Sequence, residues 1–194
     1  AHLFLDATYT KVRMHDIVSD CAVFVAVGIE AETGRRMLLG VSVGLSEAAE
    51  HWSSFIQSLR MRGMNRPNCI TSDDHKGIRK ALAETLTGVP WQRCQFHFQQ
   101  NAQAHVTSVR YRSIAAAHIR NVFNAGNRTS AELMIRNTLS TFREDKQYKL
   151  ADWFEENIEE KINLIREHIS KKECMYMCDK NTFNCEVCNN FEDC

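Results

Sequence analysis

The feature that most constrains the fold is an unbroken apolar run, CAVFVAVGI, at residues 21–29. A short, valine-rich run of this kind is typical of a strand buried on both faces. It is far shorter than the roughly 18–20 apolar residues that a membrane-spanning helix needs. Strand-like segments flank it, LFLDATYTKVRM at residues 3–14 and MLLGVSVG at residues 37–44. Three consecutive strands with short connections predict an antiparallel meander.

Helices and strands alternate after the meander. Ser46 is expected to cap a helix in EAAEHWSSFIQSLRMRGM, residues 47–64, where apolar residues recur on one helical face. NCITSD at residues 68–73 predicts a fourth strand, and HKGIRKALAETL at residues 75–86 predicts a second helix. WQRCQFHF at residues 91–98 indicates either a fifth short strand or a strand-to-helix corner. This order predicts an α/β protein with a mixed sheet.

The composition of the chain changes after Phe98. Residues 99–170 contain one glycine and no proline, and their apolar pattern predicts several helices. The last stretch, residues 171–194, holds five of the eight cysteines and has no clear period. We therefore expect a core at residues 1–98, a helical block at residues 99–170 and an atypical, disordered cysteine-rich tail.

Net charge and cysteine content limit the classes of function that fit the chain. Lys and Arg together number 24, and Asp and Glu together also number 24, so the formal net charge is zero. A protein that binds nucleic acid through its overall charge is normally basic, so such a role must use local patches here. No signal peptide opens the chain, which favours a reducing cytoplasm and reduced thiols.

Two aspartates occupy places where a carboxylate needs an explanation. Asp6 lies inside the first predicted strand, where a buried charge is unfavourable unless it is paired or bound to a metal. A strand edge or a solvent-facing position would also account for it. Asp73 ends the fourth predicted strand, and ligands collect at such strand ends in open α/β sheets. Asp73 or Asp74 could instead cap the helix that follows.

The first and fourth strands are natural neighbours in a meander that is followed by a crossover. Two carboxylates brought together there repel each other unless a cation lies between them. Mg²⁺ is the usual cation, held by one or two carboxylates and a substrate phosphate. Asp6 and Asp73 are therefore the candidate ligands of Mg²⁺ (or Mn²⁺).

Cys94 and His97 lie three residues apart in the aromatic stretch WQRCQFHF. They are half of the four ligands that a structural zinc site needs. They could also form a nucleophile and its base, although residues three apart in a strand point to opposite faces. The remaining interpretation is a buried thiol that packs as a small hydrophobe beside a hydrogen-bonded histidine.

Three segments together resemble a known family. LFLDATYTKVR, TSDDHKGIRKAL and WQRCQFHFQQNAQAHV, in this order and spacing, closely resemble bacterial transposases of the mutator type, the group that contains IS256-like elements. The resemblance covers approximately residues 2–160. It implies an RNase H-like fold with a long helical insertion before the last acidic residue. The family's first two catalytic aspartates fall on Asp6 and Asp73, and its C-x-x-H signature falls on Cys94 and His97.

The resemblance also implies an activity of the DDE type, in which carboxylates hold the divalent ions that cleave DNA and transfer a strand at element ends. Asp6 and Asp73 are then metal ligands. Cys94 and His97 are expected on a strand next to that of Asp73, with His97 directed toward the carboxylates. The implied partners are DNA and, when the protein is complete, further copies of itself. The implied location is the bacterial cytoplasm, at the nucleoid and away from membranes.

The family's third acid is the weakest part of the match. It is a Glu within a pattern T-N-x-x-E-R-x-N, and TFNCEVCN offers Thr182, Glu186 and Asn189 at the matching offsets. Phe183 and Val187 replace the expected Asn and Arg. Glu186 is the candidate third catalytic residue. The alternative is a frameshifted or rearranged tail in a truncated or degenerate copy.

Three further alternatives stay open. Four cysteines of the tail form the pattern C-x₃-C-x₆-C-x₂-C, which could bind Zn²⁺; they are Cys174, Cys178, Cys185 and Cys188. The chain could also be an inactive remnant that acts at most as a binding or oligomerisation module. A different RNase H-like nuclease acting on RNA or hybrids rests on fold analogy alone.

Overall fold

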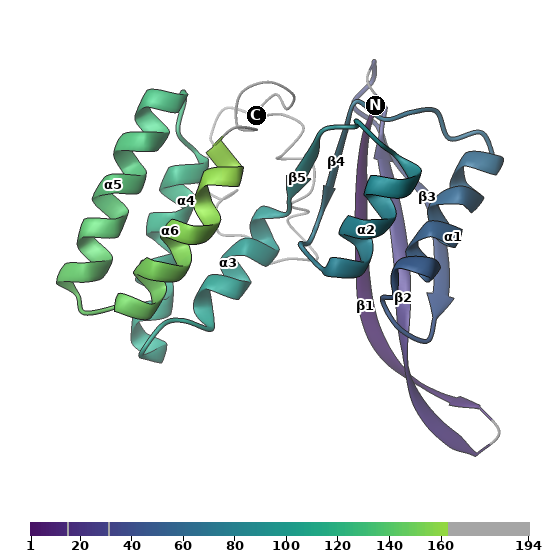
Figure 1. Ribbon diagram of the computed structural model, residues 1–194, viewed down its shortest axis with the longest axis horizontal. Coiled ribbons are helices and arrows are strands. Elements are labelled where there is room, and N and C mark those ends of the chain that lie inside the picture. The colour runs from purple at the N-terminus through teal and green to yellow at the C-terminus, as the bar shows by residue number, and fades with distance from the viewer. Residues whose placement is uncertain (15, 31, 163–194) are drawn as a thin grey trace. The chain divides into compact units, whose positions relative to one another are not determined.

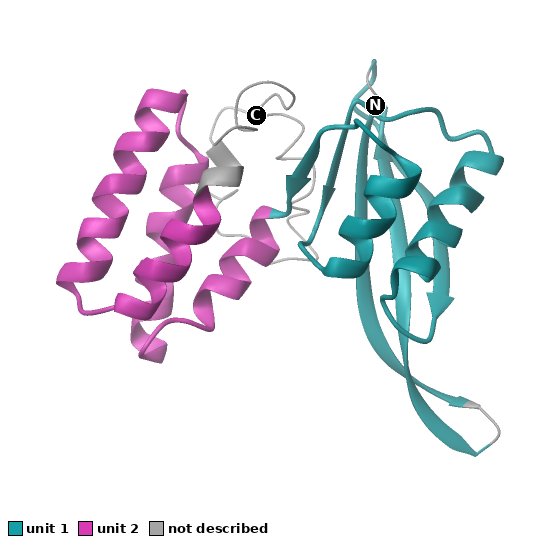
Figure 2. Ribbon diagram, viewed as in Figure 1, with its two compact units in different colours: residues 1–94 teal, residues 95–194 magenta. Residues whose placement is uncertain are grey.

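A computed structural model of the protein describes residues 1–14, 16–30 and 32–162 (Figure 1). The expectations for Glu186 and for the four cysteines of the tail lie outside the described residues. The chain forms two compact units, which divide between Cys94 and Gln95 (Figure 2).

The first unit is built on a five-stranded mixed sheet with the strand order β3-β2-β1-β4-β5. The first three strands pair antiparallel, whereas β4 pairs parallel with both β1 and β5. The strands are β1 (His2–Met14), β2 (Ile17–Ile29), β3 (Arg36–Gly44), β4 (Cys69–Ser72) and β5 (Trp91–Arg93). The predicted meander and the neighbouring first and fourth strands are confirmed. This is the RNase H-like topology that we expected.

Helices α1 (Ala49–Met61) and α2 (Lys76–Thr85) connect β3 to β4 and β4 to β5, and they cover one face of the sheet (Figure 1). Their apolar sides pack on alternate residues of the strands to form a single core. The expected cap at Ser46 is wrong, because the residue before α1 is Ala48 and no side chain caps the helix. The Ser46 carbonyl instead accepts a 2.8 Å hydrogen bond from Nδ1 of His51.

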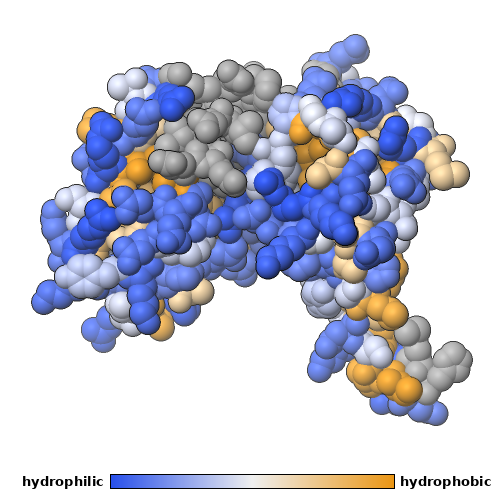
Figure 3. Space-filling view, in the orientation of Figure 1, coloured by the Kyte–Doolittle hydropathy of each residue, from blue (hydrophilic) through white to orange (hydrophobic). Residues whose placement is uncertain are grey.

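The β1–β2 hairpin extends beyond the rest of the sheet (Figure 1). β4 pairs only with residues 2–4 of β1, and β3 pairs with β2 only from Ala22 onward. Apolar residues gather toward the end of this hairpin (Figure 3), among them Ile17 and Val18, which are 68% and 53% exposed. In the part of the chain that the structure describes, no helix is long and apolar enough to cross a membrane.

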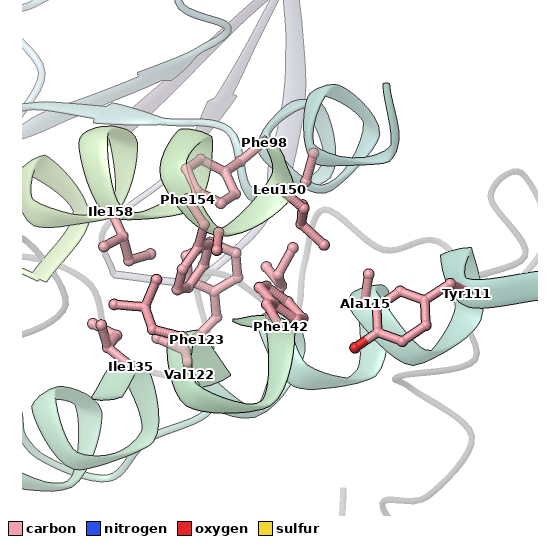
Figure 4. Packing of buried hydrophobic residues seen from close by; sticks show 14 residues of the cluster. Phe98, Tyr111, Ala115, Val122, Phe123, Ile135, Phe142, Leu150, Phe154 and Ile158 are labelled. Carbon is pink, nitrogen blue, oxygen red and sulfur yellow. The ribbon is translucent and has the colours of Figure 1, made fainter. Parts of the chain in front are cut away.

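The described part of the second unit is entirely helical. Its helices are α3 (Gln95–Gln103), the 3₁₀ turn η1 (Val109–Tyr111), α4 (Arg112–Phe123), α5 (Arg128–Glu144) and α6 (Tyr148–Ile162). A second core joins them, with Phe98, Phe142 and Phe154 fully buried at its centre (Figure 4). Their rings meet edge to face, which is the favoured geometry for aromatic pairs.

Candidate active site

The sheet brings the two candidate aspartates to the same level. Phe4 of β1 pairs with Thr71 of β4 in parallel register. Asp6 lies two residues further along β1, and Asp73 directly follows the end of β4, two residues after Thr71. Both acids therefore lie at the carboxyl side of the segment in which β1 and β4 pair.

Asp6 belongs to the face of the sheet opposite helices α1 and α2. Leu5 packs in the core beneath the helices, so alternation along β1 turns Asp6 to the opposite face. A hydrogen bond of 2.8 Å joins Nε2 of His2 to Oγ1 of Thr71 on that same face. Asp6 is exposed and Asp73 is half-buried, so solvent and ligands can reach this edge.

His2 lies four residues before Asp6 on β1 and is almost completely buried. Its ring stacks on Phe4 with 4.3 Å between the ring centroids. Burial, together with the positive charge of the nearby amino terminus, lowers the pKa of His2 to about 4. The imidazole is therefore neutral at pH 7, and its bond to Thr71 ties β1 to β4 directly behind the candidate site.

Asp73 and Asp74 have different surroundings. The Asp73 carboxylate accepts a hydrogen bond from the His75 backbone N–H at 3.3 Å. Asp74 forms ion pairs with Arg93 at 3.3 Å and with Arg79 at 3.7 Å. The expected helix cap at either aspartate is wrong, because His75 caps α2 through its ring Nδ1.

Cys94 and His97 fall on different elements. The Cys94 backbone N–H donates to the Ser72 carbonyl at 2.6 Å, which continues the ladder between β4 and β5 by one residue. Cys94 is therefore level with Asp73. His97 lies in the first turn of α3, in the other compact unit. The expectation that both residues lie on a strand is wrong, and the stretch WQRCQFHF is a strand-to-helix corner.

The donor set suits a hard divalent cation. Asp6 and Asp73 supply carboxylate oxygens, which Mg²⁺ and Mn²⁺ prefer, and Mg²⁺ commonly uses one or two protein carboxylates with water and phosphate. Among the described residues, no group of three or more His, Cys, Asp or Glu side chains is placed to hold a metal. The two aspartates thus fit the metal but form only part of its coordination shell.

Some basic residues that could have faced DNA have structural roles. Arg60 donates to the Thr85 carbonyl at 3.2 Å, and Arg66 donates to the Thr87 carbonyl at 2.7 Å. These carbonyls lie at the C-terminal end of α2, where main-chain acceptors lack helical donors. The segment RMRGMNR, residues 60–66, therefore joins the C-terminal ends of α1 and α2.

A basic region was missed by the sequence interpretation. Residues 95–143 contain six arginines and a single acidic residue, Glu132, although the chain as a whole is neutral. Arg128 pairs with Glu132, and Arg143 pairs with Glu155. The other four form no ion pair within the described residues; they are Arg110, Arg112, Arg120 and Arg136. Counting charge by segment instead of over the whole chain would have revealed this region.

Comparison with known proteins identifies the relatives of the chain. The sequence profile of a family described as "Transposase, Mutator family" matches residues 1–182. The transposase for insertion sequence element IS406 of Burkholderia multivorans is 45% identical over 163 residues, which cover 84% of this chain and 42% of that protein. The transposase for IS256 in transposon Tn4001 of Staphylococcus aureus is 36% identical over 100 residues, which cover 52% of this chain and 25% of that protein. The chain thus spans less than half the length of these relatives.

A solved structure gives a much more distant match. The catalytic core domain of HTLV-2 integrase in complex with magnesium aligns with 50% of this chain and 63% of that chain, at 15% identity and a TM-score of 0.28.

Proposed function

Because this chain belongs to the Mutator family of transposases, we propose that it is the catalytic part of a DNA transposase. Its reaction is the cleavage of phosphodiester bonds at the ends of an element and the transfer of the resulting strand to new DNA. The observation that supports the proposal is the parallel pairing of β1 with β4, because Asp6 and Asp73 both lie at the carboxyl side of the paired segment. We place this reaction at the bacterial nucleoid, where both DNA substrates are found.

Asp6 and Asp73 hold the metal in this proposal. Mg²⁺ or Mn²⁺ bound there supplies the Lewis acidity that activates a water or a DNA 3′-hydroxyl and stabilises the leaving oxygen. Glu186 remains the proposed third acid. Cys94 is level with Asp73 at the edge of the sheet, and His97 lies in the first turn of α3. We assign both residues a supporting role.

DNA is the partner that the charge distribution supports. Arg110, Arg112 and Arg136 are exposed, and none of them forms an ion pair in the described part of the chain. Arginines without acidic partners are available to neutralise phosphates, and the release of counterions then favours binding. We therefore propose that the helical unit carries part of the DNA-binding surface.

Self-association is the second partner proposal. The edge strand β3 exposes Leu38, Val41 and Val43 at 66%, 55% and 62%. An edge strand with an apolar surface and unpaired main-chain groups is a template for pairing with another strand. We propose that a second copy of the protein covers it. Sedimentation should show association that weakens in Val43→Lys, and equal association of the variant would reject this surface.

A metal-binding experiment tests the catalytic proposal. Titration with Mn²⁺, followed by electron paramagnetic resonance, should show binding that Asp6→Asn and Asp73→Asn each weaken. Asp20→Asn is the matched control, because Asp20 is exposed on the β1–β2 hairpin, away from the acidic edge. Nicking of a duplex that carries the element's own ends should follow the same order and stop on chelation. Equal Mn²⁺ binding by all four proteins would reject the site.

A further inference from the structure

Two hydrogen bonds connect a tryptophan to the main chain of a candidate metal ligand. Nε1–H of Trp91, on β5, donates to Oγ of Ser72, on β4, at 2.8 Å. The Ser72 hydroxyl in turn donates to the carbonyl oxygen of Asp73 at 2.8 Å. Ser72 is 1% exposed, so water does not compete for either bond. The indole of Trp91 is thereby linked to the peptide group of Asp73.

A second set of contacts holds the indole itself. The Arg79 guanidinium lies over the Trp91 ring, with 3.6 Å from Cζ to the ring centroid. Arg79 also pairs with Asp74, and Asp74 pairs with the buried Arg93, two residues after Trp91. The turn after β4, the first part of α2 and the strand β5 are thus joined in one closed network.

We propose that Trp91 is a positioning residue for the metal ligand Asp73, an inference that rests on the proposed function. The hydrogen-bond chain ends on the main-chain carbonyl of Asp73 and does not engage its carboxylate. A fixed carbonyl fixes the peptide plane after Asp73, and with it the direction of the bond from Cα to the side chain. Trp91 does not touch the metal or the DNA; it acts through Ser72 and the Asp73 backbone.

Hydrophobic packing of Trp91 alone would not explain why its Nε1–H is directed at Ser72. Trp52, in the same unit, is 0% exposed, and its Nε1 has no hydrogen-bond partner among the described residues. Trp91 is only half-buried, yet its Nε1–H is directed at the one hydroxyl that contacts the Asp73 carbonyl. The two tryptophans therefore provide a matched pair, one that packs and one that positions.

The test measures Mn²⁺ affinity in the whole chain after removal of single hydrogen bonds. Trp91→Phe deletes the N–H and keeps a ring for Arg79, while Ser72→Ala deletes both hydrogen bonds. Because partners behind a metal ligand typically account for 10–100-fold in affinity, we expect each variant to weaken Mn²⁺ binding about tenfold. The double variant should bind no more weakly than Ser72→Ala, since both changes break one chain.

Trp52→Phe is the control for the loss of tryptophan volume. It should lower the melting temperature and leave Mn²⁺ affinity unchanged, whereas Trp91→Phe should weaken Mn²⁺ binding. A second measurement needs no metal: the ¹³C chemical shift of the Asp73 carbonyl should move in Trp91→Phe and stay fixed in Trp52→Phe. An unmoved carbonyl signal, or wild-type Mn²⁺ affinity in Trp91→Phe, would overturn the positioning role.

The outcomes also separate this inference from the function on which it rests. If Asp73→Asn abolishes Mn²⁺ binding while Trp91→Phe retains it, the metal site stands and the positioning role is rejected. If Asp73→Asn binds Mn²⁺ like the wild type, the proposed function and the inference both fail.

Discussion

Arg93 and Asp74 form an ion pair, with 3.3 Å between Nη1 and Oδ2, that joins β5 to the turn after β4. The Arg93 side chain is 8% exposed, and the Asp74 side chain is 34% exposed. Within the described residues, the adjacent Asp73 forms no ion pair, and its carboxylate accepts a hydrogen bond from the His75 backbone N–H. Two consecutive aspartates are therefore separated into one that stabilises the fold and one that is available to a ligand.

This difference predicts opposite effects of the same substitution. Asp74→Asn should lower the free energy of unfolding by about 1–3 kcal/mol, because the nearly buried Arg93 loses a charged partner. Asp73→Asn should change it by less than about 0.5 kcal/mol. Urea denaturation of the two variants measures both values. A larger loss in Asp73→Asn than in Asp74→Asn would contradict the assignment.

The sequence could not distinguish these two aspartates. TSDD presents them as equivalent, and the partners of Asp74 come from α2 and from β5, 5 and 19 residues away in sequence. The strands were easier to predict, because their apolar runs are bounded by turns and their order follows from short connections. The pairing of β1 with β4 also followed from that order, so the position of Asp6 and Asp73 at the carboxyl side of the paired segment was predictable.

Local geometry was less predictable. WQRCQFHF is short enough to satisfy both a strand period and a helical period, so the start of α3 at Gln95 had no distinct signal. His75 caps α2 through a ring nitrogen, which is uncommon compared with the Asp and Ser residues that precede it. In both places the tertiary contacts of the turn, not local propensity, determined the result.

The burial of His2 predicts a dependence of stability on pH. Its pKa is about 4 in the folded protein, against 6.5 for an unperturbed histidine. Below pH 6.5 the His2 imidazole binds a proton in the unfolded chain, whereas in the folded chain it binds one only below about pH 4. Stability is therefore complete above pH 6.5 and falls as the pH is lowered to 4, by at most about 3 kcal/mol.

His2→Asn isolates this contribution, because the amide can still bond to Thr71 and does not titrate. Urea denaturation at a series of pH values should show a smaller loss in the variant than in the wild type between pH 6.5 and 4. Parallel curves for the two proteins would mean that His2 protonates as readily in the folded state as in the unfolded state.

Substitution of Gly77 by alanine should have a steric cost that exceeds the gain in helix propensity. A Cβ at this position, in the first turn of α2, would overlap the main-chain carbonyl oxygen of Glu47. Alanine favours a helix over glycine by about 1 kcal/mol, but the overlap involves backbone and cannot be relieved by a rotamer. Gly77→Ala should therefore destabilise the first unit, by about 1–3 kcal/mol.

Gly126 is the matched control, because a Cβ there would meet nothing within 4 Å. Thermal denaturation of Gly126→Ala should differ little from the wild type. A neutral Gly77→Ala would show that the segment before α1 can move away from α2 at no cost.

The arginines of the helical unit that form no ion pair within the described residues predict how DNA binding depends on salt. Each phosphate contact contributes about 0.9 to the slope of log affinity against log salt concentration. If Arg112 and Arg136 each contact one phosphate, the double variant Arg112→Gln/Arg136→Gln should bind duplex DNA more weakly and with a slope reduced by about 2. Fluorescence anisotropy over a series of KCl concentrations measures this slope.

The control removes two arginines that already have acidic partners. Nε of Arg128 lies 2.5 Å from Oε1 of Glu132, and Nη2 of Arg143 lies 2.6 Å from Oε2 of Glu155. Their cations are largely neutralised within the protein, so Arg128→Gln/Arg143→Gln should reduce the slope by less than about 1. Both double variants lose the same formal charge, so a purely long-range effect would weaken them equally. Equal slopes would thus contradict direct phosphate contacts at Arg112 and Arg136, and would move the search for the DNA surface to the acidic edge of the sheet.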